Sequence, residues 1–354
     1  MSSRTLAQHA SSRIATVPCP LCATPGENFL CVRTRHTDSS IQKFGHLYRG
    51  TKSSEWRVCS TCGFVHHNPR PAQKALEQFY AGPHYVPRVT PEAFHHMDWF
   101  RSFTQDYYGA KIEFALKHSG LATGKVFELG NTSGGVPLLL NDRGWTVHGI
   151  ESCPSAYTFT QERLKLPSIQ QGFFSSNTRV PEKVDLIWIN HMLSQYSDVH
   201  DVMKGLTQMM QPGGYLFTVS PTCFHNVSAQ SLRWMNACTY SMFTHHSLNQ
   251  LLSQYGFEEV THLYNGFDLE KDDLWHLARF TGRKLDPKSF YESPGRVRFS
   301  VNVVNPLRSF LLFPFYGHHA TGKRFLPLRA ARVLFRNPRD FVRKLGSGLR
   351  RMVG

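Results

Sequence analysis

The stretch KVFELGNTSGG at residues 125–135 decides the fold. Residues 125–129 are mostly apolar and stop at a glycine-rich turn, which predicts a short buried strand. The mostly apolar residues 136–143 predict a helix, and residues 145–150 predict a second strand that is followed by Glu151. Strand, glycine-rich turn, helix, strand and acid in this order are typical of a nucleotide-binding α/β unit, in which the ligand lies at the carboxyl ends of the strands.

The region around this unit continues the alternation of strands and helices. Because dehydrogenases also use a glycine-rich turn of this kind, the elements that follow it have to distinguish between enzyme classes. Apolar stretches predict strands, and apolar residues at helical spacing predict helices. The expected strands are 184–190, 215–219, 257–260 and 275–280, and the expected helices are 100–114, 202–210 and 248–255.

Five short motifs in this region match one family. They are ELG at 128–130, GIE at 149–151, VDLI at 184–187, MQPGG at 210–214 and YGF at 255–257. Together they resemble the class I S-adenosylmethionine-dependent methyltransferases from about residue 92 to residue 283. The resemblance implies an α/β fold with a Rossmann-like seven-stranded sheet, a domain at 121–283 that binds the cofactor, and S-adenosylmethionine as that cofactor.

Two C-x-x-C pairs lie near the N-terminus. Cys19 and Cys22 form the first pair, and Cys59 and Cys62 form the second, which is followed by Gly63. Two such pairs can supply the four thiolates that a structural zinc ion prefers. A thioredoxin-like redox pair and cysteines without a special role are the alternatives. We therefore expect Cys19, Cys22, Cys59 and Cys62 to bind structural zinc.

The second pair opens the run CSTCGFVHHNPRP at 59–71, which leads into a predicted helix at 72–80. This run resembles the zinc-ribbon segment that precedes the catalytic domain in a large group of small-molecule methyltransferases. The expected division of the chain is a flexible N-terminus at 1–17, a zinc ribbon at 18–71, a helical linker or cap at 72–120, and the cofactor domain.

The resemblance also implies which residues hold the cofactor. It places S-adenosylmethionine over the glycine turn with the Glu151 carboxylate on the ribose. The implied cofactor-binding residues are Glu128, Gly130, Asn131, Thr132, Gly134, Glu151, Asn190 and His191.

The sequence departs from the family pattern at two places. Thr132 stands where the family usually has a second glycine, and the family's H-x-L-E-H reads HMLSQ at 191–195. The general base that is usual in this family therefore cannot be assigned to a residue of this sequence. Either another side chain is the base for an altered substrate, or catalysis has been lost. The candidate catalytic residues are His191, His245 and His246, and the apolar loop at 221–244 is either a lid or part of the core.

The net charge of +15 is concentrated at the C-terminus. Residues 296–354 carry 13 basic side chains and one acidic side chain, whereas residues 71–295 carry 18 basic and 21 acidic ones. We expect a basic, amphipathic helical extension at 284–354. It is either a solvated helical face packed on the domain or a surface that docks on an anionic membrane. The slightly acidic centre disfavours nucleic acid as the partner.

These features predict methyl transfer to a small molecule or glycan, such as a sugar, a polysaccharide precursor or a natural product, at oxygen or carbon. A non-catalytic methyltransferase-like binding module is the alternative. An RNA methyltransferase is disfavoured because the sequence lacks an N-P-P-Y or D-P-P-Y motif. No apolar run is long enough to span a bilayer, and residues 1–17 are polar, so we expect a cytoplasmic protein, with peripheral attachment to a membrane as a further option. The sequence names neither the acceptor atom nor the number of subunits.

Overall fold

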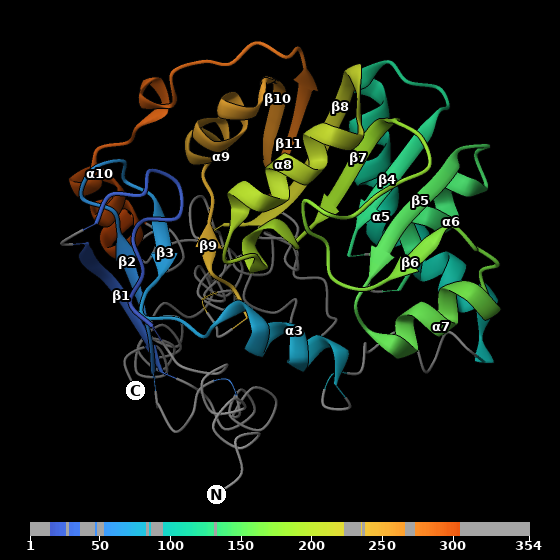
Figure 1. Ribbon diagram of the computed structural model, residues 1–354, viewed down its shortest axis with the longest axis horizontal. Helices are drawn as coiled ribbons and strands as arrows, with labels where there is room; N and C mark the ends of the chain where they lie inside the picture. Colours follow the sequence, from blue (N-terminus) through green and yellow to red (C-terminus); the bar gives the residue numbers. More distant parts are fainter. Residues whose placement is uncertain are drawn as a thin grey trace, which may run out of the picture.

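The computed structural model describes residues 15–25, 28–35, 47, 53–82, 85, 95–130, 133–222, 235, 238–265 and 273–304. Its centre is a seven-stranded sheet in the order β10-β11-β8-β7-β4-β5-β6 (Figure 1). The strands are β4 (Lys125–Leu129), β5 (Thr146–Glu151), β6 (Ile169–Gln171), β7 (Val184–Asn190), β8 (Met210–Pro221), β10 (Phe257–Asn265) and β11 (Asp273–Phe280). β8, β7, β4, β5 and β6 are parallel, while β11 is antiparallel to β8 and to β10. The predicted seven-stranded α/β sheet is confirmed.

Helices cover both faces of this sheet, which explains why its central strands are continuously apolar. Alternate side chains of a strand point to opposite faces. Val126 and Trp188 pack with α5, α6 and α7, whereas Phe127 and Ile189 pack with α8 and α9. The helices are α5 (Met97–Ser119), α6 (Gly135–Asn141), α7 (Pro154–Glu162), α8 (Val199–Met209) and α9 (His245–Leu252).

A second, four-stranded sheet lies beside the first. Its order is β1-β2-β3-β9, and all neighbouring strands are antiparallel. Three strands come from the N-terminal region, and the fourth comes from the chain that follows β8. Their bounds are β1 (Phe29–Arg35), β2 (Ser53–Val58), β3 (Val65–His67) and β9 (Ser241–Met242).

One helical stretch closes the small sheet on one side. It consists of α10 (Pro294–Phe299) and the π-turn η4 (Ser300–Val304). Val297 and Val301 pack there against Cys31, Trp56 and Met242. The core of the small sheet therefore combines residues from both ends of the described chain.

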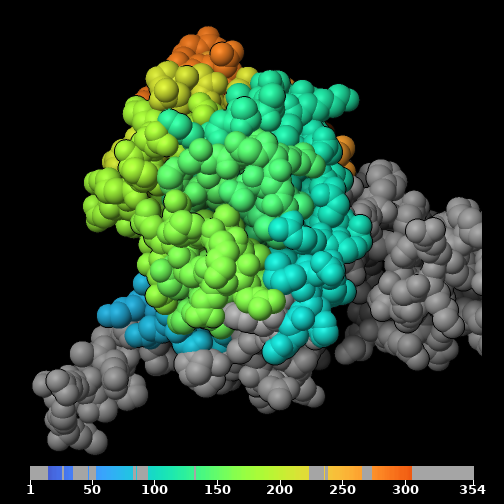
Figure 2. All heavy atoms as spheres, turned by 90° about the vertical axis from the view of Figure 1, so that its right-hand side faces the viewer, coloured from blue at the N-terminus to red at the C-terminus, as the bar shows by residue number. Residues whose placement is uncertain are grey.

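Helix α3 (Gln73–Ala81) leads from the small sheet toward the large one, and in Figure 1 it lies below the edge at which β7 and β4 end. Figure 2 shows the side of the molecule that is on the right in Figure 1, where α5 (cyan) and the segments around β5, β6 and α7 (green) form one continuous face. The predicted loop at 221–244 supplies core residues in its described part, because Met235 and Tyr240 are buried.

Several expectations fall on residues that are not described. They are the N-terminus up to residue 14, Asn131 and Thr132, most of the loop at 223–237, and the basic extension from residue 305 onward. Within the described part of the chain, no helix is both long enough and apolar enough to cross a membrane.

Candidate cofactor site and cysteine cluster

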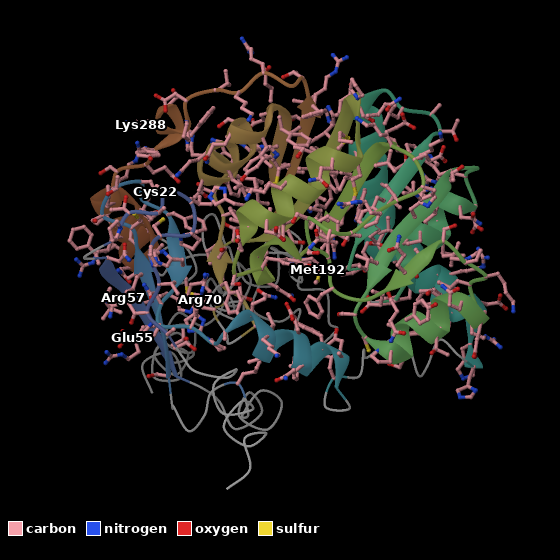
Figure 3. All side chains as sticks on the ribbon, in the orientation of Figure 1. Cys22, Glu55, Arg57, Arg70, Met192 and Lys288 are labelled. Carbon is pink, nitrogen blue, oxygen red and sulfur yellow. The ribbon has the colours of Figure 1, made fainter. Side chains whose placement is uncertain are left out.

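The parallel strands β4, β5 and β7 end at one edge of the large sheet, and this edge gathers most of the residues that the sequence singles out. Glu128 lies near the end of β4, Glu151 is the last residue of β5, and Asn190 is the last residue of β7. His191 and Met192 follow Asn190, and Met192 marks this edge in Figure 3. The carboxyl edge of such a sheet is where α/β proteins bind their ligands.

The glycines of the turn after β4 are required by the backbone and by packing. Gly130 has φ +71°, and a Cβ atom there would lie 2.5 Å from the Met192 side chain. Gly134 has φ +72°, and its Cβ would lie 2.5 Å from the Leu164 side chain. A residue with a side chain would therefore be strained at both positions, and Met192 or Leu164 would have to shift to make room for it. The His191–Met192 turn also lies directly against the glycine turn.

Two buried carboxyl groups lie at this edge. Burial raises the pKa of Glu128 well above its ordinary value, and the neighbouring Glu151 carboxylate raises it further. Among the described residues, the Oε2 atom of Glu128 has no hydrogen-bond partner. Glu151 is held by the backbone N–H of Cys153, which donates to its Oε1 at 2.6 Å. Two buried carboxyl groups side by side make this edge suited to a positively charged ligand.

Aromatic side chains from α3 and the segment after it lie near Glu151. Tyr80 and Tyr85 pack edge to face with ring centroids 4.6 Å apart, and Tyr80 also contacts Phe173 at 6.4 Å. Burial raises the pKa of Tyr85, and the nearby Glu151 carboxylate adds to this effect. The sequence contained a signal for this cluster, since a helix ending in Phe79-Tyr80 follows the N-P-R-P motif, but the residues were not predicted to lie at the site.

A buried cluster of charged residues surrounds His191. The Nε2 atom of His191 lies 3.3 Å from Oδ1 of Asp273, and Nζ of Lys111 lies 3.7 Å from Oδ2 of the same carboxylate. Lys111 also donates to the Asn190 side-chain oxygen at 3.5 Å and lies 4.2 Å from the centre of the Tyr107 ring. His191 has φ +60°, a conformation that non-glycine residues adopt mainly where the surrounding structure imposes it.

Sequence reasoning missed Lys111 and Asp273. The available signal was a lysine on the buried stripe of α5, which also carries Phe100, Tyr108 and Ile112. A lysine is rarely fully buried unless it is paired. Its partner could not be identified, because Asp273 lies 162 positions further along the chain.

The structure places His245 and His246 in a different cluster. The centres of the two rings lie 3.9 Å apart with their planes tilted by 39°, while His245 stacks on His262 at 4.1 Å and contacts the Tyr264 hydroxyl at 3.0 Å. Burial lowers the pKa of His245 to about 4, helped by the two neighbouring histidines. These contacts connect α9 with β10, and they do not include the Asp273–His191–Lys111 group.

The four predicted metal ligands come together. The sulfur atoms of Cys19, Cys22, Cys59 and Cys62 all lie within 4.8 Å of one another. The Cys19–Cys62 distance is 3.7 Å, and the Cys22–Cys59 distance is 3.6 Å. A tetrahedral zinc site with bonds of about 2.3 Å has sulfur–sulfur edges of about 3.8 Å. The four sulfur atoms therefore fit a zinc ion.

The N-P-R-P motif joins the cysteine region to the loop after β7. The Arg70 guanidinium, labelled in Figure 3, donates to the Ser197 carbonyl at 2.9 Å and lies 4.9 Å from the centre of the Tyr240 ring. The Ser197 N–H donates to the Gln73 side chain at 2.7 Å. In the same loop, the Ser194 hydroxyl donates to the His191 carbonyl at 3.0 Å. Short contacts thus connect the small sheet to the turn that carries His191.

Comparisons with known proteins agree with the fold of the central region. Residues 100–263 match the family model of a methyltransferase domain. No curated protein matches the chain.

Solved structures with a similar arrangement include several methyltransferases. The N-methyltransferase NodS from Bradyrhizobium japonicum WM9, in complex with S-adenosyl-L-homocysteine, is 17% identical with a TM-score of 0.39, over 50% of this chain and 86% of that one. The mitomycin 7-O-methyltransferase MmcR is 16% identical with a TM-score of 0.39, over 59% of this chain and 71% of that one. Likenesses this distant say nothing about the substrate. The family-model match carries the conclusion that residues 100–263 are a methyltransferase domain.

Proposed function

We propose that the protein transfers a methyl group from S-adenosylmethionine to a small molecule or glycan. The observation that carries this proposal is the pair of buried carboxyl groups, Glu128 and Glu151, beside the glycine turn of a methyltransferase domain. S-adenosylmethionine contains a sulfonium and an ammonium group, and these positive charges would complement the two buried carboxyl groups. Glu151, at the end of β5, is placed to accept hydrogen bonds from ribose hydroxyls.

His191 is the side chain that we propose as the proton acceptor. When bound, S-adenosylmethionine supplies an electrophilic methyl group, and an acceptor that carries a proton must lose it as the new bond forms. With Nε2 of His191 held at 3.3 Å from Asp273, the Nδ1 atom would take that proton. The Asp273 carboxylate would then stabilise the imidazolium, and Lys111 lies 3.7 Å from the other oxygen of this carboxylate. An oxygen acceptor is the simplest case of this chemistry.

Calorimetric titration of S-adenosylmethionine into the full chain tests cofactor binding. We expect one cofactor per chain, and a loss of affinity of about tenfold or more in Glu151→Gln, because a hydrogen bond to a charged group contributes about 1.5–3 kcal/mol. Glu113→Gln is the matched control, since Glu113 lies on the exposed side of α5 in an ion pair with Arg143. Absence of binding at millimolar cofactor would instead support the non-catalytic binding module.

We also propose that the four cysteines hold a structural zinc ion. Support comes from the sulfur distances and from the burial of three of the four residues, Cys19, Cys59 and Cys62. Four thiolates would complete the coordination shell and leave no position for a substrate. Metal analysis of the purified chain should give one zinc per chain, with loss of the metal in Cys59→Ser. Cys31→Ser is the control, because Cys31 is also buried in the small sheet but lies outside the cluster. A content well below one zinc in the unaltered chain would contradict this proposal.

A further inference from the structure

The helical stretch formed by α10 and η4 has an apolar side that is exposed in the described part of the chain. Val297 and Val301 on its inner side are buried against the small sheet. On its outer side, Phe299 is 58% exposed, Val303 45% and Val304 39%. A helix that packs on a sheet normally places polar residues on its outer side, so these three apolar residues need an explanation.

The neighbouring strand β1 adds two more exposed apolar side chains. Phe29 is 44% exposed and Leu30 is 38% exposed, and β1 packs against η4 (Figure 1). In the described part of the chain, eight large apolar side chains are exposed, and five of them lie on these two segments. We call Phe29, Leu30, Phe299, Val303 and Val304 the α10 face. Clustering of this kind marks an interaction surface, whereas single exposed apolar residues do not.

Positive charges accompany the α10 face. Arg296 and Arg298 are both exposed on α10, and Arg296 precedes Phe299 by one helical turn. The described chain ends on this face at Val304, and residues 305–354 follow with 11 basic side chains and one acidic side chain. Apolar side chains beside arginines, continued by a basic segment, are typical of proteins that lie on an anionic membrane.

We propose that the α10 face binds the surface of an anionic phospholipid bilayer. Phe299 and Val303 would enter the boundary between headgroups and acyl chains, while Arg296 and Arg298 would contact lipid phosphates. The charge argues against two other occupants. A second copy of the chain would bring an equally basic surface, and the chain's own basic segment would have to pack on arginines of the same sign. Nucleic acid phosphates would leave the apolar side chains without a partner.

Co-sedimentation of the full chain with lipid vesicles tests the proposal. We expect binding to vesicles of phosphatidylcholine mixed with phosphatidylglycerol, weak or no binding to phosphatidylcholine alone, and release by added salt. The double variant Arg296→Gln/Arg298→Gln should weaken binding by more than about tenfold, because each basic residue near an anionic surface contributes about fivefold. Phe299→Ser/Val303→Ser should weaken binding as well, and by an amount that depends little on salt.

Matched controls separate the α10 face from general surface effects. Leu263→Ser removes a similarly exposed apolar side chain on β10, and Lys117→Gln/Lys183→Gln removes two exposed charges elsewhere on the molecule. Both controls should bind as the unaltered chain does. Equal binding to the two kinds of vesicle, or unchanged binding by both α10-face variants, would overturn the proposal. Binding to duplex DNA that is tighter than binding to vesicles and unaffected by Phe299→Ser/Val303→Ser would assign the surface to nucleic acid instead. None of these outcomes depends on methyltransferase activity.

Discussion

Glu128 is protonated over a wider pH range in the folded protein than in the unfolded chain, because burial and the neighbouring Glu151 both raise its pKa. A cationic ligand beside it favours the ionised form. We therefore predict that S-adenosylmethionine binding releases a proton wherever Glu128 is protonated in the free protein, and that affinity increases as pH rises through this raised pKa. Titration calorimetry in two buffers with different enthalpies of ionisation measures the number of protons released.

The variant Glu128→Gln provides the control for this prediction. It should bind the cofactor without releasing the proton and should lose the pH dependence of affinity. The sign of the stability effect follows from the same shift. The free energy of unfolding should decrease as pH rises from the ordinary carboxyl pKa through the raised one, and Glu128→Gln should remove this decrease. Proton release that is unchanged in Glu128→Gln would rule out this role for the residue.

The Lys111–Asp273 pair predicts a large loss of stability when only one partner is removed. Asp273→Asn leaves a fully buried lysine with its main counter-charge gone, which should lower the free energy of unfolding by about 3–5 kcal/mol. Lys111→Met/Asp273→Leu should recover most of this loss, because it leaves no buried charge unpaired. Urea denaturation measures both effects. Asp142→Asn, which breaks an exposed ion pair with Arg101, should cost less than about 1 kcal/mol.

At the scale of elements, Arg70 connects the small sheet with the loop after β7. Its guanidinium is buried, donates to the Ser197 carbonyl and lies over the Tyr240 ring. We predict that Arg70→Met lowers the free energy of unfolding by about 1.5–3 kcal/mol. Loss of the hydrogen bond to Ser197 should also make the loop that contains the His191 turn more mobile. Hydrogen exchange of the backbone amides at 194–197 should increase in this variant. Unchanged exchange there, together with unchanged stability, would show that Arg70 does not join the two parts. Arg57→Met is the control, since Arg57 donates to Asn28, Glu55 and Asn68, which all belong to the N-terminal region.

The elements also show what the sequence can and cannot predict. β4 and β7 were predicted with their observed bounds, because strands buried on both faces are continuously apolar and end at turns. β6 and β9 were not predicted, since three and two residues are too few to show a pattern and are strands only because a neighbour pairs with them. β8 begins at Met210 rather than at the expected residue 215, because Met210 already pairs with Val184 of β7; the register then shifts, and pairing resumes at Tyr215.

Some residues of the candidate site could likewise be predicted from the sequence, and others could not. The resemblance to the methyltransferases implied that Glu128, Glu151, Asn190 and His191 hold the cofactor, and the structure brings all four to one edge because the carboxyl ends of neighbouring parallel strands lie together. Lys111 and Asp273 meet there through the packing of α5 against the first residue of β11, which no local pattern encodes. His245 and His246 were candidates because of residue type and position, and the structure instead places them in the histidine cluster of α9 and β10.

At the scale of the whole molecule, the cysteine cluster shares a core with the methyltransferase domain. Cys19 and Cys62 pack in the same apolar cluster as Phe243, Leu248 and Met203. We predict that removing the proposed zinc ion with a chelator lowers the stability of the entire protein, by about 5 kcal/mol or more, and not that of the N-terminal region alone. Scanning calorimetry should show one unfolding transition that shifts to lower temperature. Tryptophan fluorescence should report the same transition, because Trp56 is buried in the small sheet and Trp188 in the large one. Two transitions, of which only one moves, would contradict the prediction.

The short strand β9 has a consequence for recombination between relatives. Two residues of the chain that follows β8 complete the small sheet by pairing with Val65 and His66 of β3. A crossover placed between the N-terminal region and the large sheet would separate these strands and join β3 to a foreign partner. Functional chimaeras should therefore require that the segment around Ser241 and Met242 and the N-terminal region come from the same parent protein. This holds although about 170 residues separate the two segments in the sequence.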